Sequence, residues 1–323
     1  MTEASITLHW PRYASSLSEL SPGQIDSENT WYRLDAFIPP SDVPQVVTPI
    51  RAFVDTLIRE KPDGNTQVFR AGLRLVHKNG LSPNERRVVC KVAYGGRRVD
   101  ALKAEARIYT EKLRHLQGMV IPTIYGCYVG KTNEGHTGIL VLQDVGDSLK
   151  ASLRYYDLAL RKQVVLALHL IHKAGVVHND FKERNLVVRM NKDLGVPTVM
   201  VVDFGNASDH VCPIRDDMIR FYIPKPDRLV FKCQELYVVC AERAEVWRPA
   251  ILDYCGKPVP STWAIDGPEE LVRKAKAQMG IDPANPEEAK RSAEEACQSL
   301  WRRVHERNYW DANPQVQSWP DAI

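Results

Sequence analysis

The eleven residues 176–186 constrain what this chain can fold into more than any other segment. They follow an apolar stripe of helical period over about residues 158–173, and they present Asp180, Lys182 and Asn185 within six residues. The stripe indicates a buried helix, whereas three charged or amide side chains so close together indicate an exposed turn. The segment therefore predicts a functional loop held by a rigid helix.

A second acidic residue, Asp203, stands at the end of the next apolar run and directly before Phe204 and Gly205. It follows Asn185 by 18 residues, and the apolar runs between them indicate a hairpin of two short strands. Two carboxylates and an amide on adjacent loops offer the oxygen ligands that Mg²⁺ binds together with phosphate groups. These residues therefore suit a hard cation such as Mg²⁺.

The rest of the chain predicts strands around one helix, followed by a mainly helical part. Apolar residues at alternate positions indicate strands, and apolar residues at steps of three and four indicate helices. We expect strands at 68–76, 87–93, 121–128, 138–142, 185–190 and 198–202. We expect helices at 99–116, 158–173, 268–278 and from Pro286, with Asn285 as N-cap, to about 306.

Residues 1 to about 45 mix proline, serine and aromatic residues without a clear period, so we interpret them as an irregular extension. Strands with one helix, followed by a mostly helical part, predict a two-lobed α+β layout.

Composition excludes several classes of protein. The 323 residues are 44% hydrophobic and 26% charged, which is typical of a globular protein. The 43 basic and 40 acidic residues give a net charge of +3, which argues against a nucleic-acid binder. No apolar run reaches the ~20 residues of a membrane span, and the first residues lack the pattern of a signal peptide. We therefore expect an intracellular protein, cytoplasmic or nuclear, that binds neither nucleic acid nor membrane.

The seven cysteines favour the same compartment, because their number is odd and no C-x-x-C pair occurs. Cys212, Cys233 and Cys240 near His210 could be imagined as a zinc site. Their spacing contains no tight ligand pair, so buried or reactive thiols are the favoured interpretation.

Two motifs of eukaryotic-type protein kinases resemble the loop and the later acidic residue. Residues 178–185 (HNDFKERN) are similar to the H-x-D-x-K-x-x-N catalytic loop, and residues 203–205 match the metal-binding D-F-G. The chain thus resembles the protein kinase-like superfamily, as a diverged Ser/Thr protein kinase domain of the kind common in fungi. This resemblance implies a bilobal protein kinase-like fold of the α+β class, with a small β-rich N-lobe that carries one regulatory helix and a larger, mainly helical C-lobe.

The resemblance also implies domain boundaries. Residues 1–50 would be the irregular N-terminal extension and 51–142 the kinase-like N-lobe. Residues 143–323 would be the C-lobe, with a non-standard activation region and a helical C-terminus.

For ATP binding, the resemblance implies one strand residue, one helix residue and a hinge. Lys91 would hold the α- and β-phosphates, and Glu105, fourteen residues later, would orient Lys91. Gln143, Asp144 and Val145 fall where the family binds adenine through backbone groups.

For catalysis, the resemblance implies that Asp180 accepts or orients the proton of the attacking hydroxyl and that Lys182 stabilises the transferring phosphoryl group. Asn185 and Asp203 would hold Mg²⁺. Three aromatic residues fall where the family stacks side chains that align its lobes: Tyr109, His178 and Phe204.

The glycine-rich loop is the weakest part of the resemblance. Aligning Val68 with the valine of G-x-G-x-x-G-x-V puts Lys61, Asp63 and Thr66 at the glycine positions and leaves only Gly64 nearby. Glycines there let backbone N–H groups approach phosphates closely, so either the true loop lies elsewhere in the chain or the nucleotide would be held differently or weakly.

Two further departures concern regulation and the acceptor. Asn179 replaces the arginine that pairs with a phosphorylated activation segment, and residues 206–246 contain no A-P-E. Three functions remain open: an ATP-dependent protein Ser/Thr kinase, which Lys182 favours; a small-molecule kinase of the same fold, which the missing A-P-E leaves possible; and a catalytically weak pseudokinase that serves as a binding module. The hydroxyl acceptor, protein or small molecule, is not specified by the sequence.

Overall fold

The computed structural model describes residues 5–10, 30–38, 50–62, 64–77, 80–190, 197–221 and 223–312. By its internal contacts the chain divides into two compact units. The first unit is Met1–Lys150 with Leu170–Val211, and the second unit is Ala151–His169 with Cys212–Ile323. Residues 170–211, which the sequence groups with the later part of the chain, thus cluster with the strands.

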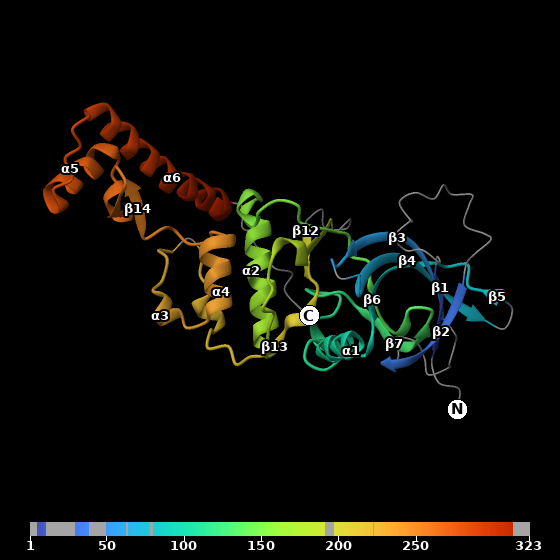
Figure 1. The fold of residues 1–323 in the computed structure, drawn as a ribbon. Coiled ribbons are helices and arrows are strands. Elements are labelled where there is room, and N and C mark those ends of the chain that lie inside the picture. The colour runs from blue at the N-terminus through green and yellow to red at the C-terminus, as the bar shows by residue number, and fades with distance from the viewer. Residues whose placement is uncertain are drawn as a thin grey trace. The chain divides into compact units, whose positions relative to one another are not determined.

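The strands at the start of the first unit are β1 Ser5–Trp10, β2 Thr30–Ile38, β3 Ile50–Glu60, β4 Thr66–His77, β5 Gly80–Leu81, β6 Arg86–Tyr94, β7 Ile124–Thr132 and β8 Gly135–Gln143. Among the described residues, seven of them form a closed mixed barrel in the order β3-β1-β2-β7-β8-β6-β4, with β4 paired again to β3. The pair β1–β3 is parallel and the other neighbours are antiparallel. Figure 1 shows this ring of strands.

The closed barrel corrects the predicted fold class. A bilobal α+β protein kinase-like fold was expected, but the described strands form a closed mixed barrel, and the structure shows no bilobal kinase architecture. Residues 1 to about 45 were interpreted as irregular, yet they supply β1 and β2. Both strands bury apolar residues, with Ile6, Leu8 and Leu34 at most 1% exposed. By pairing with β3 and β7 they cover edges that an open sheet would leave unpaired.

Alternation along the strands separates the barrel interior from its outer face. In β6, Val88, Cys90 and Val92 are fully buried in the barrel core. Their neighbours Val89 and Lys91 point to the other side of the strand and line a cavity on the outer face. The same alternation occurs in β4. Three of its residues lie in the barrel core, Phe69, Ala71 and Leu73, and Val68 and Arg70 line the cavity.

Helix α1 Gly96–Thr110 packs against β6, β7 and β8. It confirms the helix expected at 99–116 but ends six residues earlier, and a 3₁₀ turn, Arg114–Leu116, follows. Its buried residues are Val99, Leu102, Glu105, Ala106 and Tyr109, so one carboxyl group, that of Glu105, lies in an otherwise apolar and aromatic stripe.

Short elements that carry the loops complete the first unit. They are β9 Asp147–Ser148, β10 Val176–Val177, β11 Leu186–Met190, β12 Pro197–Val201 and β13 Ser208–Asp209. The antiparallel pairing of β11 with β12 confirms the predicted hairpin. The predicted helix at 158–173 is confirmed as α2 Leu158–Lys173, which belongs to the second unit up to His169 and to the first unit from Leu170.

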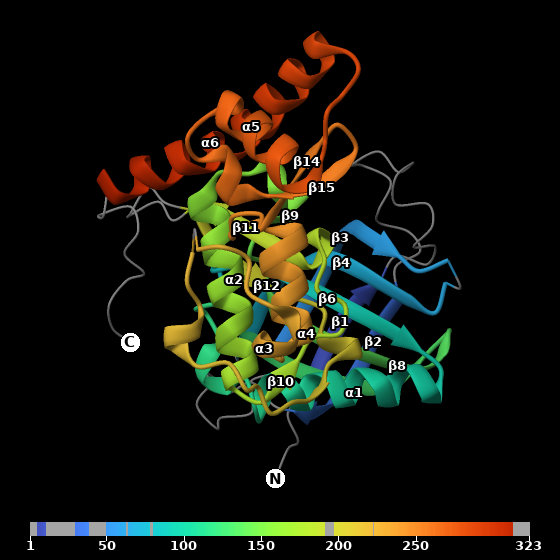
Figure 2. The same ribbon diagram turned by 90° about the vertical axis from the view of Figure 1, so that its left-hand side faces the viewer.

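The second unit is mainly helical. Its elements are α3 Arg228–Phe231, α4 Gln234–Val238, β14 Ile251–Tyr254, β15 Lys257–Pro260, α5 Pro268–Met279 and α6 Pro286–Ala312. A core that includes Leu252, Leu271 and Leu300 joins β14, α5 and α6, which Figure 2 shows grouped together. The predicted N-cap is confirmed, because Asn285 Oδ1 accepts a hydrogen bond from the Glu287 amide at 3.1 Å.

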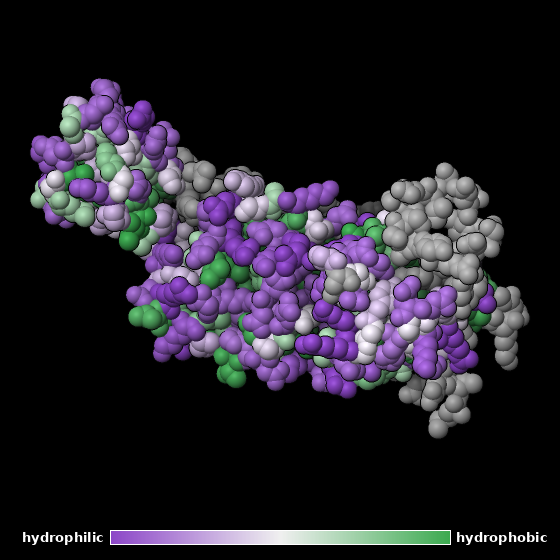
Figure 3. Space-filling view, in the orientation of Figure 1, coloured by the Kyte–Doolittle hydropathy of each residue, from purple (hydrophilic) through white to green (hydrophobic). Residues whose placement is uncertain are grey.

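The surface in Figure 3 is mostly hydrophilic, with hydrophobic side chains in small scattered groups. Within the described residues, no helix combines the length and the apolar character that a membrane span requires.

Candidate active site

A cavity of about 400 Å³ lies on the outer face of the barrel, and all of its lining residues belong to the first unit. Part of its wall is apolar and comes from β4, β6, β8 and β11, with Val68, Val89, Leu142 and Val187 as examples. Another part is polar and includes Lys91, Glu105, Asn185 and Asp203. A site of this volume with apolar walls and a few convergent polar groups suits a small organic ligand that carries charge at one end.

A second, polar cavity of about 350 Å³ adjoins the first. The two cavities share lining residues, including Lys91, Glu105, Arg184 and Asp203, and the second adds Asp180. Together they form one cleft that leads from apolar walls to a region rich in both cations and carboxylates.

Lys91 is the centre of the polar region. Its Nζ donates to Glu105 Oε2 and to Asp203 Oδ1, both at 2.6 Å. The sequence places these residues on a strand, a helix and a later loop, and the structure brings all three together. The positive charge of Lys91 therefore joins β6, α1 and the loop after β12.

The charges in this triad are strongly coupled. Burial alone would lower the pKa of Lys91, but the Glu105 and Asp203 carboxylates raise it more. Burial raises the pKa of Glu105 despite Lys91, because its side chain is only 2% exposed. Burial would also raise the pKa of Asp203, but Lys91 outweighs it and the pKa is lowered. Asp203 is therefore ionised at neutral pH.

Asp180 accepts two charged hydrogen bonds from its own loop. Lys182 Nζ lies 2.7 Å from Oδ1, and Arg184 Nη2 lies 2.6 Å from Oδ2. Partial burial opposes ionisation, but these two cations lower the pKa of Asp180. The carboxylate is thereby fixed in orientation at the polar cavity and carries its charge over the neutral range.

The hydrogen bonds of Asn185 test whether the site suits Mg²⁺. Its Nδ2 donates to the Asp180 backbone oxygen at 2.9 Å and approaches Asp180 Oδ2 at 3.3 Å. This assigns the amide orientation and leaves Oδ1 without a hydrogen bond among the described residues. Asp203 Oδ2 is likewise unused there, since Lys91 bonds Oδ1. An amide oxygen and a carboxylate oxygen at one cavity are the kind of donor that Mg²⁺ takes, so the donors fit.

Two of the five described non-glycine residues with positive φ lie in the same loops. Asn179 and Asp203 have left-handed φ values of 61° and 68°. Asparagine and aspartate tolerate this region better than most residues, and such strain is frequent at functional sites. The Asn179 side chain donates to Asn206 O and to Ser208 Oγ, each at 3.0 Å. It thereby ties the loop before Asp180 to the segment after Asp203.

An aromatic cluster connects helix α1 with the two loops. The Phe204 ring lies 5.1 Å from that of Tyr109 and 5.0 Å from that of His178. His178 is fully buried, and its Nδ1 accepts from the Asp180 amide at 3.2 Å, so the proton belongs on Nε2, which faces Val202 O at 3.1 Å. The three residues expected to stack are therefore in contact.

Of the predicted hinge residues, Gln143 and Val145 line the first cavity and Asp144 does not, and the following Gly146 lines it as well. The Val145 amide and the Asp144 carbonyl take part in no backbone hydrogen bond within the described residues. Arg70 holds this segment, because its Nε donates to Asp144 Oδ2 at 3.1 Å and its Nη2 to Gly146 O at 3.2 Å. A free donor and acceptor beside apolar side chains can bind the polar edge of a planar ring.

Sequence reasoning did not assign several basic residues to the site, among them Arg59, Arg70 and Arg184. Arg184 stands four residues after Asp180, and that spacing was the available signal. Arg59 and Arg70 lie on strands far from the motifs in sequence, so no local pattern pointed to them.

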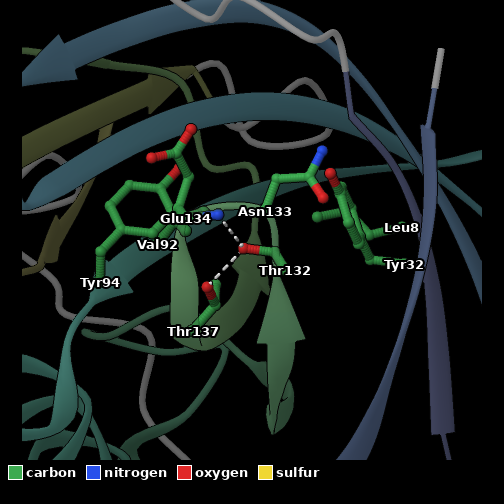
Figure 4. Close-up of a pocket in the computed structure, with 8 residues that line it drawn as sticks. All are labelled: Leu8, Tyr32, Val92, Tyr94, Thr132, Asn133, Glu134 and Thr137. Atoms are coloured by element: carbon green, nitrogen blue, oxygen red, sulfur yellow. Dashed lines mark hydrogen bonds between the residues drawn. The ribbon is translucent and has the colours of Figure 1, made fainter.

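A third cavity lies at one end of the barrel, where the β7–β8 turn meets β1, β2 and β6. Figure 4 shows Thr132 and Thr137 joined by a 2.8 Å hydrogen bond there. Its volume of about 20 Å³ is enough for one water molecule, so it is no candidate for an organic ligand.

No family model matches this chain, and a search of curated proteins finds no relative. The function is therefore inferred from the geometry of the cleft.

Proposed function

We propose that this protein is an ATP-dependent phosphotransferase, of the protein Ser/Thr kinase type, that transfers the γ-phosphoryl group of ATP to a hydroxyl group. The observation that carries the proposal is the position of Lys91, which is bonded to Glu105 and Asp203 where the apolar part of the cleft meets the polar part. The apolar walls suit adenine, and the polar region suits the phosphates.

Each residue of the polar region then has a chemical task. Lys91 binds α- and β-phosphate oxygens, and Glu105 keeps the ammonium group of Lys91 in place. Held by Asn185 and Asp203, Mg²⁺ would neutralise charge on the phosphates. Asp180 orients the acceptor hydroxyl and takes its proton as the hydroxyl oxygen bonds to the γ-phosphorus, while the bond from phosphorus to the ADP oxygen breaks.

Lys182 and Arg184 complete the arrangement around Asp180. Lys182 bonds Asp180 Oδ1. Its ammonium group can shift to a γ-phosphate oxygen as negative charge develops on that oxygen. The lowered pKa of Asp180 makes it a weak base, so its main contribution is orientation of the hydroxyl.

The acceptor distinguishes two versions of the proposal. Lys182 favours a protein Ser/Thr acceptor by its resemblance to the Ser/Thr-type loop, whereas the missing A-P-E favours a small-molecule alcohol. The experiment is phosphoryl transfer by the purified full chain with radiolabelled ATP and Mg²⁺, offered generic protein substrates in one arm and a panel of small alcohols in the other.

The matched variants are Asp180→Ala and Asp209→Ala, because Asp209 is an exposed aspartate that pairs with Lys112 away from the cavities. We expect transfer by the wild type and by Asp209→Ala, and none above background by Asp180→Ala. Transfer that survives Asp180→Ala would remove this residue from the mechanism. ATP binding without transfer to any acceptor would favour a binding module.

A further inference from the structure

The hairpin of β3 and β4 covers the cleft at the position where a glycine-rich loop was expected. The pairing of these strands shifts register between Leu57 and Arg59. This bulge breaks the strict alternation of the strand, so the consecutive residues Ile58 and Arg59 both line the first cavity. Arg59 and Lys61 also line the polar cavity beside Lys91.

The backbone of this turn is engaged in its own hydrogen bonds. The Lys61 amide donates to Thr66 O and the Gly64 amide to Lys61 O, both at 2.9 Å. These N–H groups close the turn and are not directed at a ligand. A cradle of backbone amides, which a glycine-rich loop provides for phosphates, is therefore not formed by them.

The side chains of the hairpin supply positive charge in its place. Arg59 and Lys61 make no ion pair with a carboxylate among the described residues, whereas Lys182 and Arg184 on the opposite loop both bond Asp180. Both side chains lie at the metal-ligand side of the cleft, since Arg59 and Lys61 line the polar cavity together with Asp203.

We propose that Arg59 and Lys61 bind the polyphosphate of the nucleotide through their side chains and so replace the backbone amides of a glycine-rich loop. The inference rests on the proposed function, and it names the groups that hold the phosphates. Guanidinium and ammonium groups form charge-assisted hydrogen bonds with phosphate oxygens without requiring a close approach of the backbone.

The test compares ligands that differ only in their phosphates. Affinities of the full chain for ATP, adenosine and inorganic tripolyphosphate are measured by calorimetry in Mg²⁺ for the wild type and the double variant R59Q/K61Q. We expect the dissociation constants for ATP and tripolyphosphate to rise roughly 10- to 100-fold, and that for adenosine to stay unchanged. The control is R97Q, because Arg97 is an exposed cation in the first turn of α1 that lines neither cavity.

Three results would overturn the inference, and they separate it from the proposed function. If R59Q/K61Q binds ATP and tripolyphosphate as tightly as the wild type, the side chains do not hold phosphate, while the proposed function stands. If adenosine affinity falls as much as ATP affinity, the hairpin acts on the shape of the cleft instead. If the wild type binds neither ATP nor tripolyphosphate, both the inference and the proposed function fail.

Discussion

The loop of residues 176–186 and the β3–β4 hairpin both border the same cleft, but they are built in opposite ways. In the loop, Asp180 and Asn185 are tied by hydrogen bonds to neighbours, and Asn179 holds a strained backbone in place. In the hairpin, the backbone is satisfied within the turn, and the cations Arg59 and Lys61 extend to the cavities.

Under the proposed function, this difference assigns different tasks to the two regions. Groups that take part in bond making must be held in one geometry, and the hydrogen bonds of the loop hold Asp180 and Asn185 in this way. Groups that neutralise phosphate need charge more than a single geometry, because Coulomb attraction is not directional. A hairpin without the glycine pattern can therefore still bind the phosphates of a nucleotide.

The largest expected effect separates the two regions kinetically. Asp180→Ala should lower kcat by about 10²–10⁴-fold with little change in the KM for ATP, because orienting the acceptor hydroxyl and taking its proton both act in the transition state. R59Q/K61Q should mainly raise the KM for ATP. Steady-state kinetics on both variants measures the split, and equal loss of kcat in both would remove the distinction between the two regions.

Substitutions in the triad of Lys91, Glu105 and Asp203 should have the next largest effect, on the stability of the protein. Lys91→Met leaves Glu105 buried without its cation, which should lower the free energy of unfolding by about 3–5 kcal/mol. Adding Glu105→Gln removes the isolated charge and should restore part of this loss. Chemical denaturation of the three proteins at pH 7 measures the values, and a double variant no more stable than Lys91→Met would contradict the explanation.

Lys91→Met should also change how the stability of the protein depends on pH. Burial already raises the pKa of Glu105 above 4.5, and loss of Lys91 raises it further. A raised pKa in the folded state gives stability that is present at low pH and lost as pH rises through the folded pKa. Lys91→Met should therefore have a higher melting temperature at pH 5 than at pH 8. Lys91→Met/Glu105→Gln is the control, and an equal pH response in it would exclude Glu105 as the titrating group.

The strained loop residue Asn179 should give a smaller effect. Asn179→Ala loses two side-chain hydrogen bonds and keeps a left-handed backbone, which costs roughly 1–2 kcal/mol for an ordinary residue. Asn179→Gly loses the same bonds without that strain, so it should be the more stable of the two by about 1 kcal/mol. Equal unfolding free energies would mean that the strain is relieved in the variant.

The smallest expected effect lies in the second unit. Asn285→Ala removes the N-cap of α6 and should lower the stability of this unit by about 1 kcal/mol, whereas Asn285→Asp should be nearly neutral. Neither change should alter the KM for ATP, since the cleft residues belong to the first unit. A change in that KM would show that α6 influences the cleft.

Local patterns predicted the elements that present the site. Helix α2, the β11–β12 hairpin and the N-cap at Asn285 follow from periodicity and capping, which act over a few residues. The roles assigned to Asp180, Lys182, Asn185 and Asp203 stay predictions, although the structure places all of them around one cleft except Lys182, which reaches it through Asp180.

Long-range pairing could not be predicted in the same way. The strands β1 and β2 lie in a part of the sequence where proline, serine and aromatic residues are mixed without a clear period, so local alternation did not distinguish them from an irregular segment. Their pairing with β3 and β7 closes the barrel and corrects the bilobal fold that the motifs implied.

The amino-acid sequence by itself determined which side chains are available for the proposed phosphate chemistry and which short turns present them, because spacing and periodicity are local properties. Only the tertiary structure decided that the barrel closes and that a bulge turns Arg59 toward the cleft. Both outcomes depend on the register between strands far apart in sequence, which is set by the burial and pairing of whole faces and not by any one segment.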